Sequence, residues 1–558
     1  MMKRKLSAML LILALLISAC AAPAQNEEKQ SPHKRTEPAP SAVQAEEAAP
    51  AADPTEEAAP AMPGEAESEP GAPLIVMGTS SRSRYNYDSG VCFGTCSIPI
   101  VYCGRLLGAE QQQPVEDDAD YPALAAALRA YSEESEKSLD ETFNTLVEYA
   151  QGDYKNGNYP GAEDSRWAYA SLSTPWLVRS DEKLVSFCVE NYSFAGGAHP
   201  YTSYTGVNFD SETGERLALT DLLTEKGRQI FPELFEAALA EQYPDFMRGL
   251  LVDSVQEAIR EEISEGLLYF VLDDQGMTVL INPYDLAAYA SGPAFVRLYF
   301  EDYPDVFEKK YCTTRDEWTR QLRPQNESSA YSMLNTVRYM SDGRERELKI
   351  DFSPDEYGYG PVAVTLDGRT WTDPENYCYA VTPVLMHAEG RDLLYLEYRM
   401  GNDWAKISVL DLSGEEPRLL GELSEGFYVQ MPTDVNSFYL ISRSGCMSTY
   451  AVSRRYAVSA DGTPVPLEEL YTALDKIVLT LRVDMDMTLL SGNGEGRTVS
   501  VPAGESLTIY RTNNKDLVDL ISQTGEIYRV SYDRGDDYMG VVNGVPLAEA
   551  FDGVKFAG

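Results

Sequence analysis

The chain holds few residues arranged in a way that could do catalytic chemistry. Ser180-Asp-Glu-Lys183 fits the Ser-x-x-Lys pattern of penicillin-interacting enzymes, but that pattern needs its serine at the start of a helix. Here the four residues form the charged turn of a predicted hairpin, so we interpret the match as chance. Only three histidines are present (His33, His199 and His387), too few for a histidine-rich metal site. The sequence also lacks a phosphate loop and a nucleophile elbow, so it predicts a non-enzymatic protein without metal or cofactor.

A glycine-rich segment between aromatic residues is the strongest candidate for a binding site. It reads Tyr192-Ser-Phe-Ala-Gly196-Gly197-Ala-His199-Pro200. Two adjacent glycines predict backbone in the left-handed region or in close contact with another part of the chain. For His199 two interpretations stay open. It is either held by backbone hydrogen bonds beside the glycine turn, or it contacts a ligand.

Two further motifs follow this segment in a specific order. The first comprises Asn208-Phe-Asp210, Thr213-Gly214 and Asp221-Leu-Leu, and the second is Pro283-Tyr-Asp-Leu-Ala-Ala-Tyr289-Ala-Ser-Gly292. Together, over about residues 115–305, they resemble the extracytoplasmic domain shared by the lysozyme-sensing anti-sigma factor RsiV and the non-catalytic N-terminal part of the peptidoglycan deacetylase PdaC.

The resemblance implies an envelope-facing α+β domain that binds or senses a lysozyme-like cationic wall protein or peptidoglycan. RsiV relatives add a membrane-spanning helix and a sigma-binding part, and PdaC adds a metal-dependent deacetylase domain. We find neither in this sequence, so we expect neither output. The partner-binding residues that the resemblance implies are Gly196, Gly197, His199, Tyr201, Tyr284 and Tyr289.

The N-terminus has the pattern of a bacterial export signal. Lys3, Arg4 and Lys5 precede a short apolar run that is too short for a membrane span of about 20 residues. The run ends in Ile17-Ser-Ala-Cys20, which resembles the lipobox of bacterial lipoproteins. This resemblance implies cleavage before Cys20 and attachment of acyl chains such as palmitate, which would anchor the protein to the cell membrane.

Replacing Cys20 with serine is expected to abolish lipid labelling, because the thiol is the predicted attachment point. The variant should stay uncleaved or be shed into the medium. Metabolic labelling with a radioactive fatty acid, followed by membrane fractionation, measures both effects. Unchanged partitioning of the variant into the membrane would contradict the assignment.

The charge of the chain limits the partners it can have. Its 558 residues carry 88 acidic and 46 basic side chains, for a net charge of -42. Residues 71–318 alone carry -23. A polyanion would be repelled by such a surface, so we exclude nucleic acid as a partner.

The elements that would position the candidate site fall into clusters of strands and helices, which predicts an α+β fold. A helix is predicted over 120–151, hairpins around Ser180 and Asp273, and an interrupted helical stretch over 220–264. After about Trp318 short strands dominate, with one predicted helix over 467–474. The last 70 residues or so predict a small SH3-like barrel.

These patterns predict five segments. They are a lipoprotein signal peptide (1–19), a lipidated disordered Ala/Pro/Glu tether (20–73), the RsiV/PdaC-like α+β domain (74–318), a β-rich meander domain (319–490) and a small β-barrel-like module (491–558).

The cysteines after Cys20 are seven in number. Cys92, Cys96 and Cys103 cluster in one segment, where one pair could close a small disulfide loop outside the cell. A zinc site built on these three thiols is the competing interpretation, which lacks a fourth ligand nearby.

Two rival functions stay open beside a binding or sensing lipoprotein. One is a cell-wall-modifying hydrolase with carboxylate catalysis, since 88 acidic residues allow many pairings. The other is a structural accessory lipoprotein.

Overall fold

The computed structural model describes residues 71–107, 115–164, 167–312, 315–326, 336–373, 377–401, 404–491, 496–535 and 539–556. The described residues all belong to one compact unit. The predicted signal peptide, Cys20 and the tether up to residue 70 lie outside the described residues. Among the described residues, no helix is both long enough and apolar enough to span a bilayer.

A seven-stranded sheet organises the first part of the chain. Its strands run in the order β20-β1-β2-β4-β5-β6, with β3 paired to β2. All neighbours are antiparallel except β2 and β4, which pair in parallel. The bounds are β1 Ile75–Tyr85, β2 Cys92–Leu106, β3 Val115–Asp117, β4 Ala170–Ser180, β5 Leu184–Phe194, β6 Tyr201–Asp210 and β20 Gln430–Met431.

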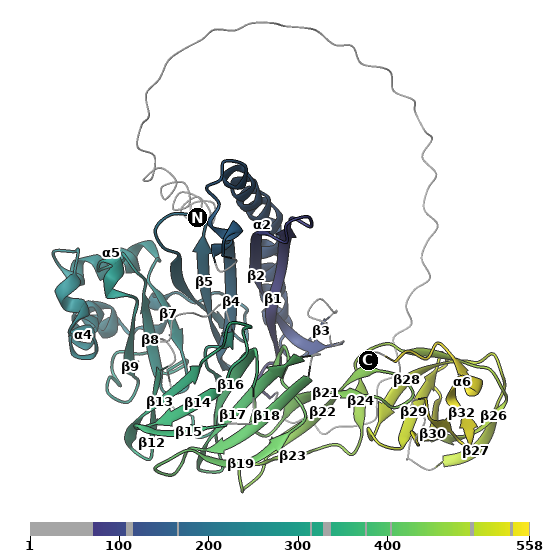
Figure 1. Ribbon diagram of the computed structural model, residues 1–558. Coiled ribbons are helices and arrows are strands. Elements are labelled where there is room, and N and C mark those ends of the chain that lie inside the picture. The colour runs from purple at the N-terminus through teal and green to yellow at the C-terminus, as the bar shows by residue number, and fades with distance from the viewer. Residues whose placement is uncertain are drawn as a thin grey trace, which may run out of the picture. The chain divides into compact units, whose positions relative to one another are not determined.

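One long helix, α2 (Pro122–Lys155), packs along β2 (Figure 1). Its buried residues recur at three- and four-residue spacings, which is the pattern that predicted it. Ser132 on the buried face joins helix and strand, because its Oγ donates to the carbonyl O of Val101 and accepts from the N–H of Val101, both at 2.8 Å. The predicted helix and the hairpin formed by β4 and β5 are confirmed.

A second α+β layer follows. Helices α3 (Leu219–Leu222), α4 (Glu225–Gln242) and α5 (Val255–Glu265) share one apolar core with the antiparallel sheet β7–β8–β9. The sheet's strands are Tyr269–Leu272, Gly276–Ile281 and Ala294–Tyr299. Thr224 and Ser254 cap α4 and α5, each accepting a backbone N–H three residues ahead. Figure 1 shows α4 and α5 beside this sheet.

The rest of the chain is mostly β-sheet. One sheet contains β10 (Trp318–Gln321), β11 (Gln325–Asn326), β16 (Ala380–Ala388), β17 (Arg391–Met400), β18 (Trp404–Asp411) and β19 (Arg418–Leu423). Another is the meander β12 (Thr336–Ser341), β13 (Arg344–Phe352), β14 (Val362–Leu366) and β15 (Arg369–Thr372).

A thirteen-stranded sheet with its branches covers residues 438–552. Its members are β21 (Phe438–Ser444), β22 (Tyr450–Val458), β23 (Pro464–Pro466), β24 (Tyr471–Ala473), β25 (Val478–Leu481), β26 (Met485–Leu490), β27 (Gly496–Val501), β28 (Ser506–Thr512), β29 (Leu517–Ser522), β30 (Ile527–Asp533), β31 (Val541–Val542), β32 (Val545–Pro546) and β33 (Phe551–Asp552). The short helix α6 (Leu547–Ala550) precedes β33.

Two expectations for this C-terminal region are corrected. The predicted small barrel over 491–558 is not closed among the described residues, since β27 ends the path of paired strands instead of returning to β28. The predicted helix over 467–474 is wrong, because β24 lies there. Tyr471 and Thr472 pair with β28, and Thr472 also pairs with β22, so sheet partners on both sides decide the conformation.

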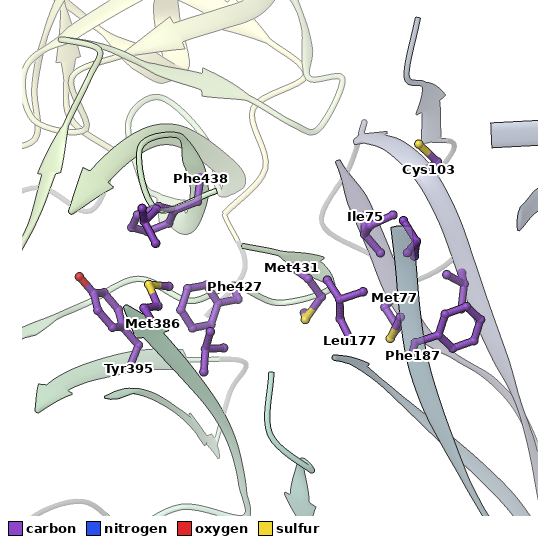
Figure 2. Close-up of a cluster of buried hydrophobic side chains, with 14 of the residues drawn as sticks. Ile75, Met77, Cys103, Leu177, Phe187, Met386, Tyr395, Phe427, Met431 and Phe438 are labelled. Carbon is purple, nitrogen blue, oxygen red and sulfur yellow. The ribbon is translucent and has the colours of Figure 1, made fainter. Parts of the chain in front are cut away.

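Residues on both sides of position 318 share one apolar core. Figure 2 shows Met431 beside Leu177 and Met77, with Phe427, Tyr395 and Phe438 beyond it in the same cluster. Strand β20 supplies Met431 and pairs with β1. The side chain of Gln430 adds two hydrogen bonds to this pairing. Its Oε1 accepts the backbone N–H of Leu106 at 3.0 Å, and its Nε2 donates to the carbonyl O of Ile75 at 3.2 Å. The α+β region and the β-rich region are therefore packed together.

Candidate functional site

The glycine-rich segment forms the connection between β5 and β6. Gly196 and Gly197 both have positive φ, at 90° and 102°, so the predicted left-handed backbone is confirmed. A Cβ on Gly196 would lie 2.6 Å from the hydroxyl O of Tyr169, whereas a Cβ on Gly197 would have no heavy atom within 4 Å. Position 196 thus favours glycine both because of its positive φ and because a Cβ would meet Tyr169. Position 197 favours glycine because of its positive φ alone.

His199 lies on the surface at the end of this connection. Its Nδ1 donates to the carbonyl O of Pro200 at 2.9 Å, as one of the two interpretations of the sequence expected. Its ring also stacks on the ring of Tyr289, with centroids 4.0 Å apart and planes inclined by 23°. Tyr289 donates its own hydroxyl to the same carbonyl O of Pro200 at 2.8 Å. The imidazole is therefore fixed in orientation while its edge stays exposed.

The connection between β8 and β9 contributes the other residues of the site, Tyr284 and Tyr289. Tyr284 is 53% exposed, has φ 75°, and its ring lies 5.7 Å from that of Tyr289. Tyr201, at the start of β6, donates its hydroxyl to the carbonyl O of Pro283 at 3.4 Å. We name His199, Tyr201, Tyr284 and Tyr289 the aromatic patch. The structure thus gathers residues that are more than 80 positions apart in the sequence.

Asp285 borders the aromatic patch beside Tyr201, and Glu262 lies close enough to Asp285 for their charges to interact. Burial raises the pKa of Asp285 to about 6, although the backbone N–H of Asn282 donates to its Oδ2 at 2.8 Å. Burial also raises the pKa of Glu262 on α5 to about 7, and the negative charges of Asp285, Glu265 and Glu261 add to the shift. Burial together with the nearby Asp285 raises the pKa of Tyr201 to about 12. The patch therefore combines aromatic faces with acids that gain charge around neutral pH.

This combination suits the binding of a positively charged group. The face of an aromatic ring attracts a guanidinium or ammonium ion, and a neighbouring carboxylate adds a direct ion pair. The sequence identified the aromatic residues through their motifs and missed Glu262, which lies on a helix outside them. Asp285 lies inside the Pro-Tyr-Asp motif, but the sequence alone could not show that it is half-buried and close to Tyr201.

The cysteine cluster does not form a bonded site. Cys92, Cys96 and Cys103 are free thiols along the single strand β2. An extended strand rises by about 3.3 Å per residue, so neighbouring members are roughly 13 and 23 Å apart, whereas a disulfide needs Cα atoms within about 7 Å. Burial raises the pKa of Cys96 to about 11 and that of Cys103 further, which keeps both thiols protonated. The expected disulfide or zinc cluster is therefore not present in this structure.

Comparisons with known proteins identify structural relatives only. No protein-family model matches the chain. No curated protein matches it either. A solved structure of a DUF3298 family member from Bacteroides fragilis is similar at 18% identity and a TM-score of 0.29, covering 43% of this chain and 95% of that chain. A DUF3298 family protein from Pseudomonas aeruginosa PAO1 is similar at 15% identity and a TM-score of 0.29, covering 44% and 98%. The match to the Bacteroides fragilis DUF3298 protein thus extends over about 43% of this chain.

Proposed function

We propose that this protein is a non-enzymatic bacterial lipoprotein, anchored to the cell membrane through Cys20, whose 74–318 region binds a cationic wall-associated protein. Lysozyme-like hydrolases are the first candidates, as the sequence resemblance implies. The aromatic patch with Asp285 and Glu262 is the observation that carries the proposal. The charge of -23 on residues 71–318 supports it by attracting a cationic partner over a distance.

Binding to lysozyme, measured by calorimetry with the full-length chain, tests this proposal. Tyr284→Asn removes the exposed ring while keeping a residue type that tolerates positive φ. We expect it to weaken binding roughly tenfold, because a desolvated cation–π contact is worth about 1–2 kcal/mol. The matched control is Tyr357→Asn, since Tyr357 is another strongly exposed tyrosine and lies outside the aromatic patch. The control should bind like the wild type.

Salt separates a specific site from general attraction. Exposed charges are screened beyond about 8 Å at physiological ionic strength, so attraction by net charge alone would be lost there. Binding that disappears at physiological salt, or that Tyr284→Asn leaves unchanged, would contradict the proposal. Release of cell-wall fragments by the purified chain would instead support the rival function of a wall-modifying hydrolase. If the chain binds no lysozyme at all, the rival function of a structural accessory lipoprotein would be favoured.

The pH dependence of the same binding follows from the two carboxylates. Their raised pKa values, about 6 for Asp285 and about 7 for Glu262, mean that both gain negative charge as the pH rises from about 5 to 8. Affinity for a cationic protein should therefore increase over that range. The double variant Asp285→Asn, Glu262→Gln should flatten this increase.

A further inference from the structure

A cavity of about 330 Å³ lies away from the aromatic patch and shares no residue with it. It is formed between the β4–β5–β6 face, the sheet β7–β8–β9, and the strands β10 and β12. It opens to solvent at β12, where the wall residues Thr336 and Arg338 are exposed. Because an apolar cavity of about 150 Å³ can hold benzene, this one has room for a molecule of about two fused rings.

Aromatic rings and aliphatic side chains form much of the wall. The ring of Tyr204 lies 6.4 Å from that of Trp176 and 4.9 Å from that of Phe295, with planes inclined by 74° and 72°. The aliphatic wall residues include Val178, Val271 and Leu280. Aromatic rings attract one another in offset or edge-to-face arrangements, so a flat ring that enters the cavity can extend this cluster.

The charged side chains of the wall are already paired within the protein. They form ion pairs of Asp273 with Arg297 and with Arg320, of Arg323 with Glu190, and of Arg338 with Glu347. Nε of Arg297 and both Nε and Nη2 of Arg320 form no hydrogen bond among the described residues, but these atoms are shielded, so a ligand in the cavity cannot reach them. A charged ligand would therefore lose its hydration without gaining a counter-charge.

Two neutral polar side chains of the wall use their polar atoms on β9. Oε1 of Gln242 accepts the backbone N–H of Arg297 at 2.9 Å, and its Nε2 donates to the carbonyl O of the same residue at 2.7 Å. The hydroxyl of Tyr243 accepts the backbone N–H of Phe295 at 3.1 Å and donates to its carbonyl O at 3.2 Å. These groups hold the wall together, so the surface left for a ligand is mainly apolar.

Hydrogen bonds between the walls keep the cavity open. Oγ of Ser186 on β5 accepts the backbone N–H of Leu272 on β7 at 3.0 Å. The side chain of Gln275, in the β7–β8 turn, binds both backbone groups of Met340 on β12, donating to the carbonyl O at 2.7 Å and accepting the N–H at 2.9 Å. A ligand that enters a preformed cavity does not have to order the protein around it, which favours binding.

We propose that this cavity binds an uncharged, flat and mostly apolar small molecule of one or two fused rings. The ring system packs against Trp176, Tyr204 and Phe295, and removal of its apolar surface from water drives the binding. A carboxylate or ammonium group on the ligand opposes binding, because the wall offers it no unpaired charge of the opposite sign. This site is independent of the aromatic patch and of the function proposed for it.

Calorimetry of the full-length chain with indole and with indole-3-carboxylate tests the proposal, since the two probes share one ring system and differ by one charge. We expect indole to bind with a Kd below about 1 mM and the carboxylate to bind at least about tenfold more weakly. Absence of indole binding, or an affinity for the carboxylate within about tenfold of that for indole, would overturn the proposal.

A substitution in the wall shows whether indole binds in this cavity. Val337→Trp on β12 places a large side chain in the wall and should abolish indole binding. Val499→Trp on β27 is the matched control, because Val499 is also a partly buried valine on a strand and does not line the cavity. The control should bind indole like the wild type. Unchanged indole binding in Val337→Trp would overturn the proposal.

A second pair of variants decides the question if Val337→Trp fails to fold. Thr336 is exposed at the opening, so Thr336→Trp leaves the core intact while it narrows the entrance. It should weaken indole binding at least about threefold, because less of the ligand can be enclosed. Thr498→Trp, at another exposed threonine on β27, is the control. Equal affinities of Thr336→Trp and Thr498→Trp for indole would overturn the proposal.

Discussion

Replacing Asp273 with asparagine is expected to lower the free energy of unfolding by about 3–5 kcal/mol, because removing one partner of a buried ion pair leaves the other charge uncompensated. Asp273 is 4% exposed and binds Arg297, with Nη2 of Arg297 donating to Oδ1 at 2.6 Å. The same Oδ1 accepts the backbone N–H of Gln275 at 2.9 Å and that of Gly276 at 3.1 Å, which closes the β7–β8 turn. Asparagine would keep the shape but leave two buried arginines facing a neutral amide.

The charge state of Asp273 sets the pH window of this effect. Burial opposes ionisation, yet Arg297 and Arg320 hold the pKa of Asp273 below its ordinary value. A depressed pKa in the folded state adds stability above the ordinary aspartate value of about 4, and this contribution is lost as the pH falls through the folded-state pKa. The difference in the free energy of unfolding between wild type and Asp273→Asn should therefore be largest at neutral pH and become smaller in acid.

Urea denaturation followed by tryptophan fluorescence measures the loss. Asp305→Asn is a suitable control, because Asp305 also forms an ion pair, with Lys226 at 3.0 Å, but its side chain is 75% exposed. Exposed pairs contribute less than about 1 kcal/mol. A loss below about 1 kcal/mol for Asp273→Asn would contradict the role of this carboxylate.

Adding a single methyl group at Gly206 is the second change with a large expected effect. A Cβ at this position on β6 would lie 1.9 Å from the carbonyl O of Phe270 and 2.5 Å from its carbonyl C. Both are backbone atoms of β7, so no side-chain rotation can relieve the clash. The backbones are further joined by Asn208, whose Nδ2 donates to the same carbonyl O at 2.9 Å. Gly206→Ala should therefore destabilise the protein by at least about 3 kcal/mol.

Gly421→Ala provides a matched control for Gly206→Ala. Gly421 lies on β19, has no positive φ, and an added Cβ would meet no heavy atom within 4 Å. Its replacement should change stability by less than about 1 kcal/mol. Thermal unfolding of both variants gives the comparison, and equal melting temperatures would show that β6 and β7 can separate without cost.

The elements that depend on local patterns could be predicted from the sequence. The helix predicted over 120–151 corresponds to α2, because a long three- and four-residue apolar period has few alternative structures. The β7–β8 hairpin followed from its Asp-Asp-Gln-Gly turn. The prediction failed over 467–474, where a short mixed segment has no period strong enough to outweigh the sheet partners on both sides of β24.

The candidate sites could be predicted only where their residues share a motif. The aromatic patch was anticipated because its members lie in two recognisable segments. The ion pairs of Asp273 with Arg297 and Arg320 were not, since the two arginines lie on β9 and β10, Asp273 lies in the β7–β8 turn, and no spacing relates the three residues. Which carboxylate oxygen each arginine contacts depends on the positions of the atoms, and the sequence does not carry that information.

The pairing of β1 with β20 has a consequence for biosynthesis. Gln430 bonds to Ile75 across 355 positions of the sequence, so the first strand of the fold is made long before its neighbour. At about 5–20 residues per second, roughly 20–70 s of translation separate the two. Throughout that interval the apolar side chains that Met431 later covers stay uncovered, and the unfinished polypeptide is open to aggregation. This part of the core can therefore be completed only after residue 431 has been synthesised.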